Sequence, residues 1–94
     1  MSLESLRAEI NGLDAEIIRL IAKRQGLAPK IAKIKIHKGI PIHDDKRTDV
    51  VLKQVFDQAV EYKIDPVAVQ HIFEILIAMN EDRQRGCSGE GNLP

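Results

Sequence analysis

The sequence predicts an all-α protein with three helices per chain, whose long, kinked first helix intertwines with that of a second copy. Apolar residues recur at alternating steps of four and three over roughly the first third of the chain, which is the spacing of a helical seam. Two later segments show helical spacing behind a capping residue. No segment shows the alternation of a strand or the turn of a hairpin. These patterns together predict an interlocked helical oligomer.

The first predicted helix runs from about Ser2 to Ile36. At about 1.5 Å per residue such a helix is roughly 50 Å long, whereas a compact chain of this size has a radius of gyration of ~12 Å. One chain cannot cover a rod of that length, so we expect a second copy to cover its seam. The missing member of the seam is Arg24, and the apolar members are Leu6, Ile10, Leu13, Ile17, Leu20, Leu27, Ile31 and Ile34.

A kink is predicted near the middle of this helix. Gly26 loosens the helix, and Pro29 lacks an N–H and clashes with the carbonyl of Gln25. The apolar spacing nevertheless continues through Leu27 and Ile31 in the same phase. A kinked continuous helix is therefore favoured over two separate helices.

A short loop should follow, because Gly39 can end the first helix and Pro41 prevents it from resuming. Either Asp44 or Asp45 can cap the next helix. The apolar positions of this second helix recur at helical spacing and are Val51, Leu52, Val55, Phe56, Ala59 and Val60.

The third helix should begin at Asp65 and Pro66, which supply a cap and a first-turn proline. It is expected to fade near Gln84 or Arg85. Residues 86–94 consist largely of Gly, Ser, Asn and Glu, which cannot bury enough surface to become ordered. We therefore expect one helical domain over residues 1–85 and a flexible C-terminal tail over residues 86–94.

Composition limits the location and the partners of the protein. Because 14 basic residues balance 14 acidic residues, neither nucleic acid nor an anionic membrane is an expected partner. Cys87 is the only cysteine, so no intrachain disulfide can form and no oxidising compartment is needed. No apolar run approaches the ~20 residues of a membrane span, and the amphipathic N-terminus does not resemble a signal peptide. A cytoplasmic location is expected.

The sequence offers no pattern for a metal, a nucleotide or a covalent nucleophile. The three histidines, His37, His43 and His71, lack metal-ligand spacing. There is no glycine-rich phosphate loop, and no serine has a histidine partner in view. We expect an activity without a cofactor.

Arg24 in the aliphatic seam requires an explanation, because burial of an unpaired guanidinium costs several kcal/mol. A structural explanation is an arginine that sets helix register by pairing with Glu16 or with an acid of the partner chain. Lys35 favours a different explanation, since it lies about 20° from Arg24 around the helix and Ala28 leaves space between them. Two cations on one apolar face predict an anion-binding site.

Four further polar side chains are candidates for this site, although each has an ordinary structural explanation. Arg7 flanks the seam near the start of the helix, where an antiparallel second copy would place it beside the later half of its partner. Arg47 falls next to Asp44 and can be a simple surface pair. Asn80 and Gln84 lie one turn apart on one face of the third helix and can be exposed amides.

Taken together, these residues resemble the all-helical chorismate mutases in order and spacing. The resemblance covers about residues 3–84. The motifs that carry it are Leu6-Arg7 with Ile10, Leu13-Asp14, Ala22-Lys23-Arg24, Lys33-Ile34-Lys35, Pro41-Ile42 with Asp44 and Arg47, and Asn80 with Gln84.

The resemblance implies an intertwined homodimer with two active sites, each built from both protomers, that rearranges chorismate to prephenate. By position, Arg24 and the partner's Arg7 would clamp the two carboxylates of chorismate. Lys35 would reach a carboxylate and the ether oxygen, to which Gln84 would also donate. Asp44 would hold the ring hydroxyl through its backbone.

The remaining positions of the resemblance are Arg47 and Asn80, which would line the pocket, and Thr48, where the family commonly has a glutamate that accepts a hydrogen bond from the substrate hydroxyl. Thr48 leaves room for low intrinsic activity, for activation by a partner enzyme of the same pathway, or for another substrate. The alternatives are therefore an isochorismate pyruvate lyase and a low-activity regulatory or dimerisation module. Pro29 is a second departure, because a bend changes the distance between Arg24 and Lys35.

Overall fold

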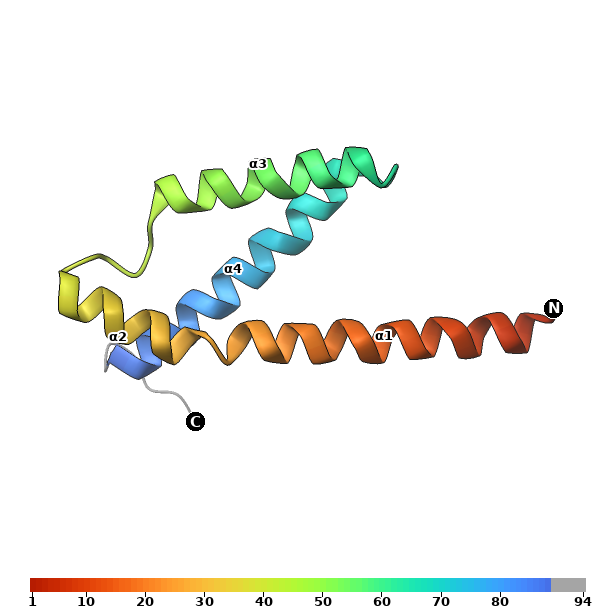
Figure 1. The fold of residues 1–94 in the computed structure, drawn as a ribbon, viewed down its shortest axis with the longest axis horizontal. Helices are drawn as coiled ribbons and strands as arrows, with labels where there is room; N and C mark the ends of the chain where they lie inside the picture. Colours follow the sequence, from red (N-terminus) through yellow and green to blue (C-terminus); the bar gives the residue numbers. More distant parts are fainter. Residues whose placement is uncertain (89–94) are drawn as a thin grey trace.

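The computed structural model describes residues 1–88, which form α-helices joined by short turns (Figure 1). No strand occurs in this range, which confirms the predicted all-α class. None of the helices in the described part of the chain is both long enough and apolar enough to cross a bilayer. The helices are α1 (Leu3–Gln25), α2 (Ala28–Lys38), α3 (Asp45–Glu61) and α4 (Pro66–Ser88).

Helices α1 and α2 are the two halves of one long helix that bends at residues 26–27, so the chain has the three helices that the sequence predicts. Gly26 and Leu27 keep right-handed helical dihedral angles, with φ of −64° and −83°. The regular hydrogen bonding lapses here because Pro29 has no N–H to donate. The predicted kink is confirmed.

The remaining helix ends follow the predicted capping signals. Gly39 ends α2 in the left-handed region at a φ of 68°, which only glycine adopts without strain. Asp44 caps α3 by accepting from the backbone N–H of Arg47 at 3.2 Å. Asp65 caps α4 by accepting from the N–H groups of Val67 and Ala68 at 3.0 and 3.2 Å.

The end of α4 differs from the prediction. The helix continues to Ser88, three residues beyond Arg85, where it was expected to fade. Gly86 costs only about 1 kcal/mol within a helix, and no proline follows it closely enough to stop the hydrogen bonding. The rest of the predicted tail, residues 89–94, lies outside the described residues.

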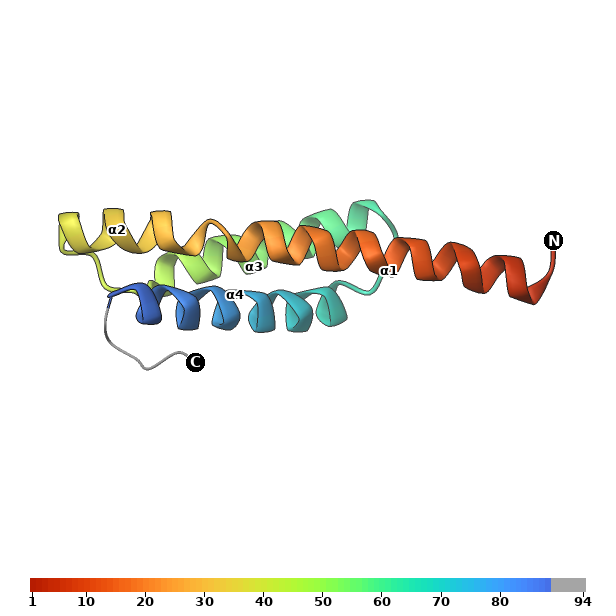
Figure 2. The ribbon, with the colours of Figure 1, turned by 90° about the horizontal axis from the view of Figure 1, so that it is seen from below.

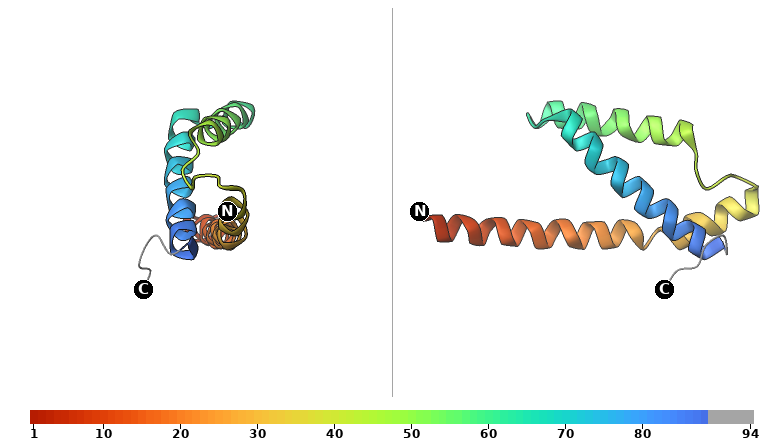
Figure 3. Two further views of the ribbon diagram at one scale, coloured as in Figure 1. Left: turned by 90° about the vertical axis from the view of Figure 1, so that its left-hand side faces the viewer. Right: turned by 180° about the vertical axis from the view of Figure 1, so that it is seen from behind.

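Helix α4 is the centre of the fold, because both α3 and α2 pack along it (Figures 1 and 2). In contrast, the N-terminal part of α1 projects past the other helices (Figure 3), and none of the residues of α1 is buried. The radius of gyration is 16.4 Å, well above the ~12 Å of a compact chain of this size. Among the residues whose burial the structure describes, the buried apolar core contains only Ala28, Ala32, Ile42, Val55 and Ala59.

Candidate active site

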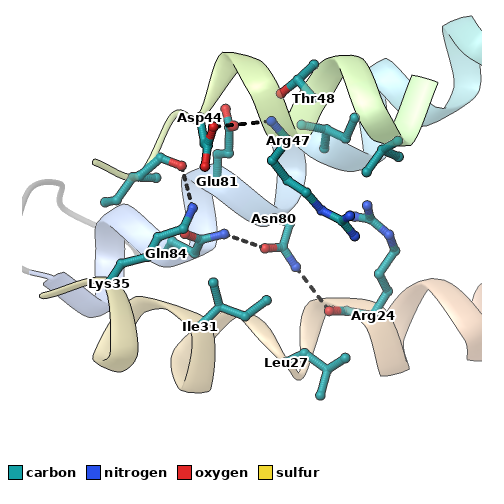
Figure 4. A pocket seen from close by; sticks show the side chains of 13 residues that line it. Arg24, Leu27, Ile31, Lys35, Asp44, Arg47, Thr48, Asn80, Glu81 and Gln84 are labelled. Atoms are coloured by element: carbon teal, nitrogen blue, oxygen red, sulfur yellow. Dashed lines mark hydrogen bonds between the residues drawn. The ribbon is translucent and has the colours of Figure 1, made fainter. Parts of the chain in front are cut away.

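A cavity of about 290 Å³ lies where the bend of the long helix, the start of α3 and the C-terminal half of α4 meet (Figure 4). This is near the lower end of the size range of small-molecule sites. Its walls are aliphatic and its polar groups are mostly cationic or amide. The lining residues are Arg24, Leu27, Ile31, Lys35, Ile42, Asp44, Arg47, Thr48, Val51, Ile77, Asn80, Glu81 and Gln84.

Arg24 reaches the cavity from the last turn of α1 and donates from Nη1 to the carbonyl oxygen of Leu76 at 2.9 Å. Its pKa is lowered from the ordinary value, first by burial and then by the positive charge of Arg47. No carboxylate of the described residues lies within salt-bridge distance of Arg24, and Glu16 pairs with Arg19 instead, at 3.4 Å. The alternative of a register-setting pair between Arg24 and Glu16 is therefore wrong. Two guanidinium groups share the pocket without an acidic partner for Arg24, and this arrangement favours an anionic guest.

The helix bend also organises the two amides of the site. At the bend the carbonyl oxygen of Arg24 accepts two hydrogen bonds, one from the backbone N–H of Leu27 at 3.2 Å and one from the Asn80 side-chain amide at 3.0 Å. A carbonyl can only accept, so Asn80 must present Nδ2 to it and Oδ1 to Gln84, whose Nε2 donates at 2.7 Å. Asn80 and Gln84 are 8% and 4% exposed. The two amides are therefore buried and joined in one hydrogen-bond network. They are not exposed amides, which was the alternative explanation for this pair.

Gln84 is left with unused hydrogen-bonding capacity. One hydrogen of its Nε2 is engaged by Asn80, and an amide nitrogen has a second hydrogen to donate. Its Oε1 is buried and has no hydrogen-bond partner among the described residues. Gln84 lines the cavity, so the second hydrogen of Nε2 makes it a candidate binding element as well as a buried one.

Lys35 lies on α2 and lines the cavity on the side away from Arg24 (Figure 4). Its Nζ donates to the carbonyl oxygen of Ile42 at 2.6 Å, which ties the α2–α3 loop to the helix. An ammonium group has three donors, so this contact leaves others for a ligand. Lys35 therefore both shapes the pocket and adds a positive charge to it.

The first turn of α3 supplies Arg47 and Thr48. The carboxylate of Asp44 accepts from the backbone of Arg47 as a helix cap, and the Thr48 N–H donates to the Asp44 carbonyl oxygen at 3.0 Å. This carboxylate therefore has a structural task, while Arg47 extends toward Arg24 (Figure 4). The cap fixes the direction in which both α3 side chains enter the pocket.

Two side chains that were not among the predicted site residues, an acid and a histidine, lie beside the cavity. Glu81 lines the cavity, and its side chain is 14% exposed. Both its oxygens contact His43 Nδ1, at 3.1 and 3.0 Å, while His43 Nε2 lies 2.7 Å from Oδ1 of Asp45. The hydrogen bonds with Glu81, and then those with Asp45, raise the pKa of His43 from its ordinary value. Glu81 could have been anticipated, because it lies three residues before Gln84 and shares its helix face.

The structure thus brings together seven of the eight predicted site residues: Arg24, Lys35, Asp44, Arg47, Thr48, Asn80 and Gln84. The eighth, Arg7, lies exposed near the N-terminal end of α1, away from the cavity of its own chain (Figure 1). Leu27 and Ile31 of the predicted seam line the cavity as well. Within the described residues, no group of three or more His, Cys, Asp or Glu side chains is arranged so that it could hold a metal ion.

The fold and the pocket define an all-helical protein with a cationic, amide-lined site for a small anionic molecule. Residues 6–85 match the family model of chorismate mutase type II. The chain belongs to the chorismate mutase type II family. A chorismate mutase from Methanocaldococcus jannaschii is 35% identical over 83 residues, which cover 88% of this chain and 84% of that protein.

Two further relatives show how widely the family varies. A bifunctional chorismate mutase/prephenate dehydratase from Buchnera aphidicola is 32% identical over 75 residues, which cover 80% of this chain and only 20% of that protein. The solved structure of a conserved hypothetical protein from Pyrococcus furiosus has a TM-score of 0.66 and 36% identity, and the match covers 88% of this chain and 95% of that one. The chain is thus similar both to a free-standing mutase and to one part of a larger enzyme.

Proposed function

We propose that this protein is an isomerase, a chorismate mutase that rearranges chorismate to prephenate in the pocket between α2, α3 and α4. The observation that carries the proposal is the set of three cations, Arg24, Lys35 and Arg47, around an aliphatic cavity that also contains the buried amide of Gln84. Chorismate carries two carboxylates on an apolar ring framework. Charge and shape of the pocket suit such a guest.

For this rearrangement the protein has to hold the substrate in the reactive conformation and polarise its ether bond. It does not have to form a covalent bond to the substrate. It is unimolecular and pericyclic, so neither a nucleophile nor a cofactor takes part. Arg24 binds a carboxylate and selects the compact conformer in which the reacting carbons lie close together. Lys35 and the free hydrogen of the Gln84 amide donate to the ether oxygen, on which negative charge builds as its bond breaks.

The second carboxylate clamp in this proposal is the partner's Arg7, supplied by an intertwined homodimer. The long helix favours this assembly, because α1 buries no residue in the single chain. Burying an aliphatic side chain of this size is worth roughly 1.5–3 kcal/mol, so a second copy laid along the stripe has a large driving force. The exposed stripe contains Leu6, Ile10, Leu13, Ile17 and Leu20.

The proposed location is the cytoplasm. The chain has a single cysteine, so it forms no intrachain disulfide and needs no oxidising compartment. Nucleic acid and membranes are not proposed partners, because the chain carries no net charge. An enzyme of the same pathway is the proposed protein partner. Support for it comes from the bifunctional relatives, whose names join a chorismate mutase to a prephenate dehydratase.

Incubating the purified protein with chorismate tests the proposal directly. We expect stoichiometric conversion to prephenate. Proton NMR monitors the conversion. A parallel incubation with isochorismate distinguishes the lyase alternative, which would release salicylate and pyruvate. Salicylate without prephenate would overturn the proposal.

Thr48 carries the second candidate function, a low-activity module that a pathway enzyme activates. A threonine hydroxyl accepts a hydrogen bond from the substrate hydroxyl more weakly than a carboxylate does. We expect Thr48→Glu to raise kcat/KM by about tenfold, since a charge-assisted bond is worth roughly 1.5 kcal/mol more than a neutral one. The matched control is Thr48→Gln, which has the same length without the charge. Measurable turnover by the wild type would exclude a purely regulatory role.

Gln84 leads to a prediction about pH. Because its amide donates without having to be protonated, kcat should persist from about pH 6 to well above neutral pH. Gln84→Ala should reduce kcat by about a hundredfold, corresponding to the ~3 kcal/mol of a lost oxyanion donor. Steady-state kinetics across this range provide the measurement. A collapse of wild-type kcat between about pH 6 and 8 would remove Gln84 from the role.

A further inference from the structure

His43 lies between two carboxylates and is flanked in the chain by Ile42 and Asp44, which line the cavity. Its Nδ1 contacts both oxygens of Glu81 at 3.1 and 3.0 Å, and its Nε2 contacts Asp45 at 2.7 Å. A neutral imidazole has one N–H, so one of its nitrogens would turn a lone pair toward a carboxylate oxygen. Both contacts are favourable only when both nitrogens carry a proton. The geometry is therefore that of an imidazolium ion.

Glu81 is the group whose charge matters to the pocket. It lines the same cavity as Arg24 and Lys35, and an uncompensated carboxylate in that wall would repel a substrate that carries two negative charges. Both oxygens of Glu81 contact the same nitrogen of His43. The carboxylate is thus held at the rim and its charge is balanced there.

We propose that His43 is a positioning residue for chorismate binding, which holds the Glu81 carboxylate at the rim and cancels its charge so that the pocket accepts a dianion. The inference rests on the proposed function, because chorismate supplies the two negative charges. His43 acts through Glu81 and takes no part in the rearrangement. It should therefore affect KM and leave kcat nearly unchanged.

The pH dependence follows from the groups that surround His43. Glu81 faces it from α4 and Asp45 from α3, while Lys35 on α2 binds the carbonyl oxygen of the preceding residue, Ile42. The two carboxylates raise the pKa of His43 above its ordinary value of 6.5. The imidazolium is thus present below pH 6.5 and is lost as the pH rises through the raised pKa. Glu81 becomes uncompensated in the same interval, so KM should rise there.

A double-mutant cycle on His43 and Glu81 separates two effects of His43. One is the cancellation of the Glu81 charge, and the other is the mechanical support of the α2–α3 loop. We expect His43→Ala to raise KM about tenfold near pH 6 with kcat retained, because the Glu81 carboxylate in the cavity wall then lacks the balancing charge of His43. Wild-type KM should approach the variant's value as the pH rises above the raised pKa of His43. In the Glu81→Gln background, His43→Ala should change KM less than about twofold and the pH dependence should vanish. The matched control is His71→Ala, which removes an exposed histidine paired with Glu74 on α4.

The outcomes distinguish this inference from the proposed function. If the wild type turns over chorismate and His43→Ala raises KM equally with Glu81 and with Gln at this position, His43 only holds the loop in place. That result would overturn this inference but not the proposed function. Absence of wild-type turnover would overturn the proposed function. If His43→Ala does not fold, His43→Gln is the second variant, since it keeps a donor but cannot carry charge. NMR titration of the His43 ring needs no substrate, and its pKa should fall in Glu81→Gln; an unchanged pKa would also overturn the inference.

Discussion

Replacing Arg24 with alanine is expected to reduce kcat/KM for chorismate at least about a hundredfold while the oligomeric state stays unchanged. Arg24 is a half-buried cation without a carboxylate partner in the described part of the chain. Its removal takes away the charge that compensates a substrate carboxylate, and a charge-assisted bidentate contact is among the stronger polar interactions. Steady-state kinetics combined with size-exclusion chromatography provide the measurement.

Two further variants make this result specific. Arg19→Ala is the matched control, because Arg19 lies on the same helix and forms an exposed pair with Glu16; it should retain wild-type kinetics. Arg24→Lys should remain impaired, since an ammonium group keeps the charge but cannot form the planar two-pronged contact. Lys35→Ala should show a loss of at least about a hundredfold as well. Near-normal kinetics of Arg24→Ala or of Lys35→Ala would contradict the proposed site.

The elements were predictable because their signals are local. The seam from Leu6 to Ile34, the caps at Asp44 and Asp65 and the bend before Pro29 each depend on residues close in sequence. The end of α4 was missed because glycine weakens a helix without stopping it. A composition rich in small polar residues therefore does not fix the residue at which a helix ends.

The candidate site was predictable only in part. The cations on the first helix and the amides on the third could be grouped through a family resemblance, and the structure brings them to one cavity. His43 and Glu81 were missed because their contact joins residues 38 positions apart in the chain. Only the packing of the α2–α3 loop against α4 makes a surface histidine the counter-ion of a pocket carboxylate. Sequence spacing carries no signal for such a pair.

The bend in the long helix links the fold to the site. At the bend the carbonyl oxygen of Arg24 accepts from the N–H of Leu27, three residues on, and also from the Asn80 amide, which in turn orients the Gln84 amide. In a regular α-helix this carbonyl would accept from the N–H four residues on. The backbone at the bend thus helps to fix the donor that the proposed chemistry needs.

The most discriminating result concerns Arg7, the one predicted site residue that is absent from the cavity of its own chain. If the partner donates Arg7, then Arg7→Ala and Arg24→Ala homodimers should both be nearly inactive. A heterodimer of the two variants, purified through two different tags, contains one site with both arginines intact and one with neither. It should recover about half of the wild-type activity, because the symmetry of a two-fold dimer gives it one complete site of two.

A control heterodimer carries the same two substitutions in one chain, and for it we expect almost no activity instead of half. When the Arg7→Ala/Arg24→Ala chain is paired with a wild-type chain, each site of the heterodimer lacks one arginine, so both sites should be nearly inactive. If each chain instead used its own Arg7, this second heterodimer would retain half of the activity and the first would have none. The comparison holds composition and mutational load constant and changes only which chain carries each arginine. It therefore tests whether the long exposed helix serves to deliver a cation to the neighbouring site.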